Sequence, residues 1–577
     1  MNVPDLKPRS VVTLASLFLL LATGCRDIQV TNPNEPDRER ALTSGQDVQA
    51  LISGAFRSYW YATHMRFPNA AFSAAADAHS SSWGGWGLHA GREPREAYNN
   101  DPSYHYNGTN EYPWEVSYSA LVGARDGLGA ILEGGVTIRE EGQDVTQRAV
   151  AFGKLVQALA LSTLAATFDR AFVVDESTDL EKLGSPSTFT PNGGVGDVVG
   201  LVPYHEVWEA AEEKYAEAIA AAQGANFTIP ASWVGDHVPW TDQDFLIFAR
   251  AFRARFRLQI PRTPAEREAV DWGAVLSDLS QDLPFAFGGQ HDGENGWWDR
   301  KKLHSASVKG WARLDNRTVG PADVSGAWEN WLAQPLNLRY PFEVLTPDSR
   351  ITQPMEPRTN GKYITFMGNS PFPASRGIYH FCHYIDHRYA HLPAANYVGF
   401  YEDFTEKEVD FLRAEALYRT GDRAGAMAIV NRYRANGDLP PFTTEQNPAG
   451  SEACVPQMPD GSCGDLWEAL KYEKRIECFH ASFGMEFFDD RGWGDLVEGT
   501  YVNLPVPGKE LLLLMMEIYT LGGPGDGTAS LGGGVTPALL NDFSPAALKV
   551  KRQALERFRV QTEERIDPGR VGSLWDG

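Results

Sequence analysis

The most constraining feature of the sequence is a helical hairpin at residues 405–436. Thr405 is a typical helix N-cap, and residues 408–418 carry apolar side chains at the three- and four-residue spacing of an amphipathic helix. Gly421 and Asp422 form a turn, and residues 424–434 return as a second helix. A hairpin of this kind buries its apolar faces only by stacking on neighbouring hairpins, so the chain should contain several.

Further helical patterns occur along most of the chain. They cover residues 44–63, 114–134, 143–168, 204–223 and 241–260. Paired helices of this length resemble tetratricopeptide units. We therefore predict a mainly α fold, a tetratricopeptide-like helical-hairpin superhelix with long irregular loops and few short strands.

Long segments without clear periodicity separate the helical pairs. They are rich in Gly, Pro, Asn, Trp and Tyr, and they cover residues 66–113, 170–203, 262–400 and 438–465. Loops of this length are usually functional or disordered, and their aromatic content argues against disorder. We therefore search these loops for a binding site.

The N-terminus has the features of an export signal. Lys7 and Arg9 precede an apolar run, Val11–Ala22, which is too short for a membrane-spanning helix of about twenty residues. The run ends in Leu-Ala-Thr-Gly before Cys25, which resembles a bacterial lipobox. We predict a signal peptide at 1–24, lipidation of Cys25 and a tether at 25–40. An ordinary signal peptide with an incidental cysteine is the alternative.

The remaining cysteines suggest one disulfide. Cys454 and Cys463 lie in a loop rich in Gly, Pro and Asp, and an exported protein meets an oxidising compartment. We predict that this pair is bonded. Cys382 and Cys478 are either buried thiols or a second bridge.

Charge and hydropathy exclude two classes of protein. Acidic residues outnumber basic ones by 75 to 52, a net charge of −23, so the chain lacks the basic surface that nucleic-acid binding needs. After the signal peptide no segment reaches membrane-spanning length. The apolar run Leu511–Met516 is short, and we expect it to be part of the core.

Four stretches of the chain form a combined pattern: the lipobox with residues 30–34 and the helix at 44–63, residues 411–436, residues 473–477 leading to 487–494, and residues 504–507 with 510–511. Together they resemble the SusD/RagB family of nutrient-uptake outer-membrane lipoproteins. Phe168-Asp169-Arg170 departs from the usual Phe-Gly-Asp, and a tail follows the usual end of the family.

This resemblance implies a non-enzymatic ligand-binding protein. It implies a lipid-anchored, surface-exposed protein of the outer membrane that captures a glycan, or a peptide, and delivers it to a SusC-like TonB-dependent transporter. It also implies a ligand-binding domain at 41–524 with loop insertions at 66–113 and 262–400. The extension at 525–577 contains a predicted helix, Ser544–Arg565, and has no predicted role.

Two loop regions have the composition of a sugar-binding surface. Flat aromatic rings cover the apolar faces of a sugar, while Asn, Asp, Arg and Gln pair with its hydroxyls. The alternative for each tryptophan is that it anchors its loop to the core. The first region supplies Trp83, Trp86, Arg92 and Asn99, and the second supplies Trp297, Trp298 and Trp311, with Arg313 after it.

Four histidines form a candidate metal cluster. His380, His383, His387 and His391 would share one face of a helix, where they could bind Zn²⁺. In a strand, His380 would lie on the opposite face from the other three. The surrounding tyrosines and phenylalanine favour a strand or loop, so we predict no metal and no cofactor.

The search for catalytic motifs finds none of the common signatures. The sequence has no H-E-x-x-H, no G-x-S-x-G and no phosphate-binding P-loop. A carboxylate group at Glu473, Glu477, Asp489 and Asp490 could suggest acid–base chemistry. We interpret Glu473 and Glu477 as helix charge pairs beside Lys474 and Arg475. We predict that the chain is not an enzyme; the alternatives are a surface glycoside hydrolase and a helical-repeat adaptor for peptide or protein.

Overall fold

The computed structural model describes residues 42–184, 199–293, 296–307, 312–368, 382–447 and 454–524. Several predictions lie outside these residues: the signal peptide 1–24, the lipidated Cys25 with its tether, Trp311, His380 and the extension 525–577.

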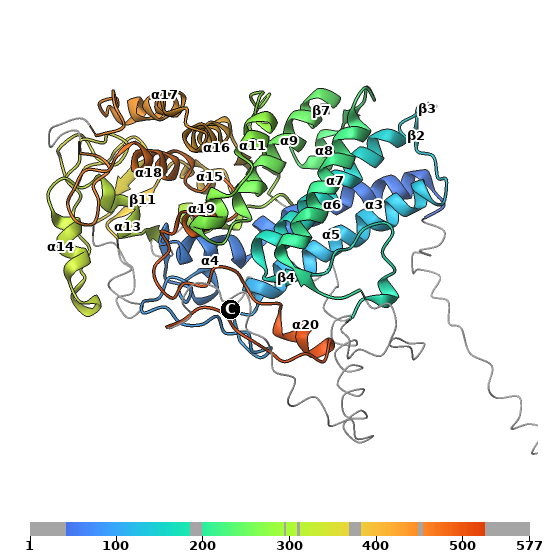
Figure 1. Cartoon of the computed structure of the whole chain (residues 1–577), viewed down its shortest axis with the longest axis horizontal. Helices are drawn as coiled ribbons and strands as arrows, with labels where there is room; N and C mark the ends of the chain where they lie inside the picture. Colours follow the sequence, from blue (N-terminus) through green and yellow to red (C-terminus); the bar gives the residue numbers. More distant parts are fainter. Residues whose placement is uncertain are drawn as a thin grey trace, which may run out of the picture.

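The first half of the chain is a layer of long helices that lie side by side (Figure 1). They are α3 (Gly45–Trp60), α5 (Gly108–Leu132), α6 (Thr146–Thr167), α7 (Tyr204–Ala222) and α9 (Asp242–Gln259), which are the helices that the periodicity predicts. Local chemistry fixes their starts. The Ser44 side chain accepts a hydrogen bond from the Asp47 N–H, and Thr241 and Asp244 form a capping box.

Helix α6 is the centre of this layer. Among the described residues it is the one helix long and apolar enough to cross a membrane, and 94% of its most apolar window is buried inside the protein. It packs against α5 and α7. The prediction that no segment after the signal peptide reaches membrane-spanning length is therefore wrong for α6 by length and composition, and its apolar residues form part of the core.

The second half contains the predicted hairpin. It consists of α16 (Glu406–Arg419) and α17 (Arg423–Arg434), with Thr405 and Asp422 as N-caps. Helix α18 (Leu466–Cys478) packs against both. The hairpin is closed by apolar contacts such as that between Phe411 and Tyr433, whose ring centroids are 4.7 Å apart.

The remaining elements are short, and the strands form two-stranded antiparallel ribbons. The helices are α4 (Phe67–Ala75), α8 (Ala231–Val234), α10 (Pro264–Glu268), α11 (Trp272–Asp278), α12 (Arg300–Ser307), α13 (Asn316–Val319), α14 (Ala327–Ala333), α15 (His391–Ala394), α19 (Met485–Trp493) and α20 (Gly508–Leu513). The paired strands are β1 (His79–Ser81) with β9 (Ala312–Leu314), β2 (Arg139–Glu140) with β3 (Gln143–Asp144), β4 (Arg170–Ala171) with β5 (Val202–Pro203), β6 (Thr228–Ile229) with β7 (Trp240–Thr241), β8 (Phe287–His291) with β12 (Gly399–Phe404), and β10 (Ile364–Phe366) with β11 (Tyr384–Asp386). The predicted fold class, mainly α with helical hairpins and few short strands, is confirmed.

Charged residues of α18 make their contacts across the fold, which corrects the prediction of pairing along the helix. Glu473 and Glu477 are buried and accept hydrogen bonds from Arg350, at 2.6 and 2.9 Å. Lys474 pairs with Asp489, and Arg475 with Asp490, both on α19. The spacing of Glu473, Lys474 and Glu477 predicts the helix correctly. It does not reveal that the partners of these charged side chains come from distant segments of the chain.

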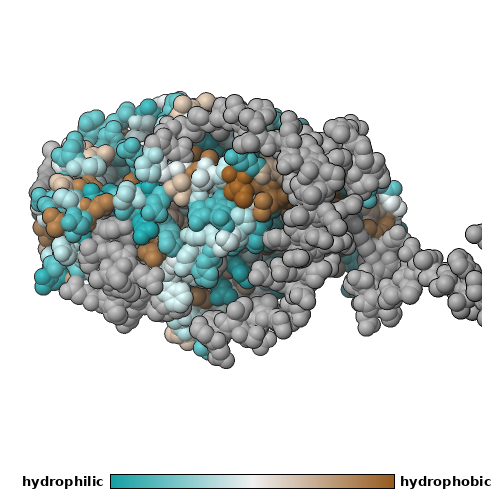
Figure 2. All heavy atoms as spheres, turned by 90° about the horizontal axis from the view of Figure 1, so that it is seen from below, coloured by the Kyte–Doolittle hydropathy of each residue, from teal (hydrophilic) through white to brown (hydrophobic). Residues whose placement is uncertain are grey.

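The apolar run at α20 is only partly in the core. Leu511 is buried, whereas Leu512 is 51% exposed and Leu513 is 42% exposed, so the prediction that the run is core is wrong for these two. Successive helical residues point about 100° apart, so only one of the three can face the core. Figure 2 views the molecule from below, the side on which Figure 1 places α20, and shows hydrophobic atoms gathered among hydrophilic ones.

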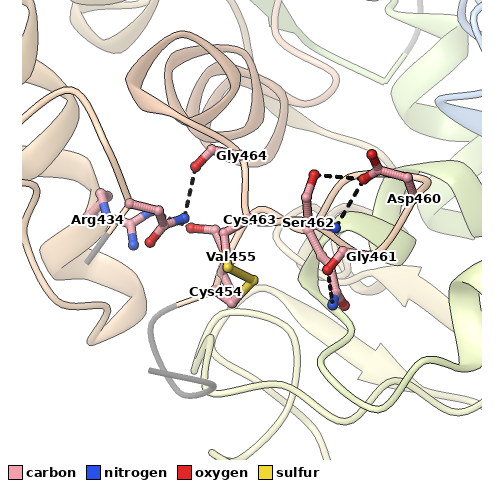
Figure 3. Close-up of a disulfide and its surroundings, with 10 residues drawn as sticks. Arg434, Cys454, Val455, Asp460, Gly461, Ser462, Cys463 and Gly464 are labelled. Carbon is pink, nitrogen blue, oxygen red and sulfur yellow. Dashed lines mark hydrogen bonds between the residues drawn. A yellow bond between two sulfur atoms is a disulfide. The ribbon is translucent and has the colours of Figure 1, made fainter. Parts of the chain in front are cut away.

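Cys454 and Cys463 form the disulfide, with Cα atoms 5.0 Å apart (Figure 3). The loop between them is tied internally, because the Asp460 carboxylate accepts hydrogen bonds from the N–H and hydroxyl of Ser462, at 3.0 and 2.6 Å. Arg434 donates to the Val455 carbonyl at 2.8 Å and fixes the loop to α17. Cys382 and Cys478, whose pairing the sequence left open, are buried free thiols.

Candidate functional site

Helix α12 joins the two tryptophan regions that the sequence treats separately. Arg300 and His304 are four residues apart and share one face of α12. The His304 ring stacks on Trp86, with centroids 4.9 Å apart and planes 9° from parallel. The Arg300 guanidinium lies 4.7 Å from the centroid of the Trp298 ring. Two rings from segments more than 200 residues apart therefore lie along one short helix.

The β1–β9 ribbon and a tight turn position Trp86. The 3₁₀ turn Gly84–Trp86 follows β1 and ends at Gly87, whose φ is 116°. A Cβ atom at Gly87 would lie 2.6 Å from the Ala74 side chain, so only glycine fits this turn. The Ser81 hydroxyl lies 3.0 Å from Nε2 of His304 and ties β1 to α12.

His304 is an uncharged partner for Trp86. Burial lowers the pKa of His304 to about 3, so the imidazole is neutral at physiological pH. Its neighbours His79 and His480 also have pKa values held well below the ordinary value, chiefly by burial. Their ring centroids are 6.4 Å apart, and that of His79 is 6.3 Å from that of His304. The floor beneath Trp86 is therefore a cluster of neutral rings.

Two fully buried ion pairs support this floor. Lys301 donates to the Glu486 carboxylate at 2.8 Å, and Lys302 donates to Asp299 at 2.6 Å. Both lysines belong to α12, and Glu486 belongs to α19. Their ammonium groups disfavour a metal cation among the three histidines.

Trp83, Arg92 and Asn99 lie toward solvent. Trp83 is 48% exposed, the Arg92 guanidinium lies 3.5 Å from the Glu96 carboxylate, and the side-chain oxygen Oδ1 of Asn99 accepts from the Asp101 N–H at 3.0 Å. Of the predicted residues in this region, Trp86 places its ring against α12, and Trp83 begins the turn that carries Trp86.

Trp297 and Trp298 have different surroundings. Trp297 packs against Phe56 and Trp60, with centroid distances of 6.2 and 5.9 Å, and a Cβ atom at Gly235 would lie 1.9 Å from its ring. This geometry matches the loop-anchoring alternative. Trp298 is half-buried and stacks beside Arg300, while its carbonyl oxygen accepts a 2.9 Å bond from the Trp60 indole.

A second arginine–aromatic pair, which the sequence did not indicate, acts electrostatically on Arg300. The Arg66 guanidinium lies 5.2 Å from the centroid of the Tyr112 ring. Burial lowers the pKa of Arg300, and the positive charge of Arg66 lowers it further. Burial raises the pKa of the Tyr112 hydroxyl to about 12, against the opposing effect of both guanidiniums. No sequence signal links these residues, because they come from three separate segments.

Arg313 differs from the other candidates because it is almost fully buried. It is 1% exposed, and none of its three side-chain nitrogens has a hydrogen-bond partner in the part of the chain that the structure describes. It pairs in register with Ser80 across the β1–β9 ribbon. Burial lowers the pKa of its guanidinium.

The histidines proposed as a metal cluster do not share a helix. His383 precedes β11, His387 follows it, and His391 begins the four-residue helix α15. The His387 ring bonds to the Thr365 hydroxyl at 2.8 Å. Among the described residues, no group of three or more His, Cys, Asp or Glu side chains is arranged to hold a metal ion.

The carboxylates considered for catalysis are committed to the scaffold. Glu473 and Glu477 bind Arg350, and Asp489 lies 3.2 Å from Arg267. Burial raises the pKa of Asp490 to about 7, a value useful to a general acid, but its side chain is buried against Arg475. A substrate in solvent would not reach it.

No known family model matches the chain, and no curated protein matches it. The structure is similar to solved structures of SusD superfamily proteins. One from Bacteroides thetaiotaomicron has 12% identity, covering 82% of this chain and 97% of its own, at a TM-score of 0.49. One from Bacteroides vulgatus has 13% identity, with the same coverages, at 0.47. A SusD-like carbohydrate binding protein from Bacteroides fragilis has 13% identity, covering 79% and 87%, at 0.48. Similarity at this level does not establish a shared function.

Proposed function

We propose that this protein binds an oligosaccharide at the aromatic row along α12 and passes it, unchanged, to a SusC-like TonB-dependent transporter. The row consists of Trp83, Trp86 with His304, and Trp298 with Arg300. The single observation that carries the proposal is that His304 and Arg300, on one face of α12, contact the Trp86 and Trp298 rings.

The chemistry of the row suits a sugar. Indole rings cover the apolar C–H faces of pyranose rings, and neighbouring polar groups pair with hydroxyls. The Trp86 ring is held on one side by the neutral His304, which fixes its orientation in advance. A preorganised ring loses little entropy on binding, so more of the contact energy appears as affinity.

The proposals for the cellular location and for the transporter partner rest on the sequence. We propose that Cys25 carries the lipid anchor, that the protein lies at the surface of the outer membrane, and that residues 41–524 form the binding domain. The lipobox-like ending before Cys25 and the SusD/RagB-like stretches support these assignments. A Cys25→Ser variant should leave the membrane fraction; retention there would contradict the anchor.

A glycan panel tests the binding site. Isothermal titration with neutral and acidic oligosaccharides should identify at least one ligand of the wild-type protein. Trp86→Ala and Trp83→Ala should each weaken its binding by roughly tenfold to a hundredfold, because aromatic anchors at a binding site are worth about 2 kcal/mol. Trp467→Ala provides the control, since the Trp467 ring contacts Tyr418, Trp493 and Arg419, none of which belongs to α12.

The outcomes separate the alternatives. Unchanged binding in both site variants would contradict the site, and the absence of binding to every saccharide would contradict the function. Chromatography of the mixtures after incubation checks the non-catalytic part. Shortened oligosaccharides whose release stops on substitution of one Asp or Glu side chain would favour a glycoside hydrolase instead.

A further inference from the structure

Two arginines at the candidate site lie on aromatic rings near each other. Arg300 covers Trp298, and Arg66 covers Tyr112, at 4.7 and 5.2 Å from the ring centroids. Arg66 follows the π-helical turn Tyr61–Met65, and that turn packs against both α5 and α12. The positive charge of each arginine acts on the Tyr112 hydroxyl. Arg66 and Arg300 therefore belong to segments that pack against each other, and each charge lowers the pKa of the same tyrosine hydroxyl.

Neither guanidinium is neutralised by an acidic side chain. Within the described ranges, Arg66 and Arg300 form no ion pair, and their recorded contacts are with aromatic rings and with each other's charge. This arrangement is costly because like charges repel, and Arg300 is also half-buried. It is unexpected in a chain with 75 acidic residues, where carboxylates are plentiful.

Within the described residues, neither Arg66 nor Arg300 donates a hydrogen bond to another side chain or to the backbone, and each guanidinium lies over an aromatic ring. A guanidinium that lies on an aromatic face presents its N–H groups in its own plane, away from the ring. Arg66 is exposed and Arg300 is half-exposed, so an incoming group can reach them. Two neighbouring guanidiniums without an acidic partner among the described residues match a carboxylate, which accepts paired N–H bonds.

We propose that Arg66 and Arg300 bind the carboxylate of an acidic sugar, a uronate unit within the oligosaccharide. This proposal rests on the proposed function and narrows its substrate class. The uronate carboxylate lies between the two guanidiniums, and the adjoining sugar rings extend along α12 toward Trp86 and Trp83. The two arginines repel each other in the unliganded protein. The bound carboxylate removes this repulsion, and the relief adds to the free energy of binding.

A matched pair of ligands tests the proposal. Trigalacturonate and its fully methyl-esterified form differ in charge but share their ring faces and most hydroxyls. In titration calorimetry the wild-type protein should bind the acid roughly tenfold to a hundredfold more tightly than the ester, the range typical of charge-assisted hydrogen bonds. The double variant Arg66→Gln, Arg300→Gln should bind the acid and the ester with equal affinity, a ratio of about one.

The control variant is Arg358→Gln. It removes one positive charge from an exposed arginine that pairs with Glu343 at 2.7 Å, away from α12, and should keep the preference for the acid. Thermal melting of each variant checks folding. The acid preference is a ratio of two affinities for one protein sample, so a partly unfolded fraction does not mimic its loss.

Each outcome bears on the proposal. Equal affinity for acid and ester in the wild type, or an unchanged preference in the double variant, would overturn it. If neutral saccharides still bind, the proposed function stands without it; if no saccharide binds, the proposed function fails as well. Free galacturonate and inorganic phosphate are tested last, as competitors of trigalacturonate. Competition by either at the same concentration as trigalacturonate would show a site for the anion alone and overturn the oligosaccharide assignment.

Discussion

Arginines in two regions of this protein have opposite surroundings. In the α16–α19 region, Arg350 is fully buried and binds Asp348, Glu473 and Glu477 through bonds of 2.6 to 2.9 Å. Around α12, Arg66 and Arg300 lie on aromatic rings without an acidic partner in the described residues. The contrast separates charges that hold the scaffold together from charges that remain available to a ligand.

The scaffold arginines connect distant segments. Arg255 bridges Asp403 and Glu408, and Arg267 bridges Glu415 and Asp489, all of them buried. A buried ion network stabilises only when every member is paired, so it is sensitive to the loss of one. The free-energy cost of burying these charges is offset by their partners within the folded protein. The cost of an unpaired arginine at a binding site is offset when the ligand arrives.

The largest predicted effect comes from breaking the scaffold network. Arg350→Met should lower the free energy of unfolding by about 3–5 kcal/mol, because three buried carboxylates lose their shared partner. Urea denaturation followed by tryptophan fluorescence measures this. Arg358→Met, at an exposed pair, should cost less than about 1 kcal/mol. Equal effects of the two variants would remove the distinction between the regions.

Acid should destabilise the region beneath Trp86. The pKa of His304 is about 3 in the folded protein, against an ordinary value of 6.5, because burial disfavours the imidazolium. Between these values the unfolded chain binds a proton that the native protein does not. The contribution of His304 to the free energy of unfolding is therefore fully present above pH 6.5. It falls as the pH drops, by about 2 kcal/mol at pH 5.

Denaturation at pH 7.5 and pH 5 checks this dependence. His304→Gln should have a smaller loss of stability between the two pH values than the wild type, since it removes one buried site that must charge on unfolding. His205→Gln, on α7, is the control and should keep the wild-type loss. An identical loss in all three proteins would contradict the assignment to His304.

The smallest predicted effect is a gain in the free energy of unfolding. Arg313 is buried without a hydrogen-bond partner among the described residues, so its charge costs free energy in the folded state. Arg313→Met keeps much of the side-chain volume and should raise the free energy of unfolding by about 1 kcal/mol. The same substitution at Arg350 should have the opposite sign. A loss of stability at Arg313 would show that it belongs to the scaffold group.

The helices could be predicted from the sequence because their signals are local. Apolar spacing and capping residues such as Thr405 and Thr241 lie within the elements that they define. The partners of Arg350 could not be predicted, since Glu473 lies 123 residues away and many acidic residues compete for it. The exposure of Leu512 also depends on which face of α20 the core covers.

The candidate site was predictable only in parts. Composition marked both tryptophan regions, but nothing local indicated that α12 would bring Trp86 and Trp298 together. The sequence of α12 is mostly polar, Arg-Lys-Lys-Leu-His-Ser-Ala-Ser, so it lacks the apolar period that identifies the longer helices. Arg66 and Tyr112 were missed because a cation on an aromatic ring has no characteristic spacing in the sequence.

A crystal structure of the protein with trigalacturonate is the most direct test of the division between paired and unpaired arginines. We predict a uronate carboxylate with oxygens about 2.8 Å from guanidinium nitrogens of Arg66 and Arg300, the ordinary distance for such bonds. The Arg350 network should be unchanged. A saccharide bound elsewhere, or one on α12 whose carboxylate points away from both arginines, would contradict the assignment.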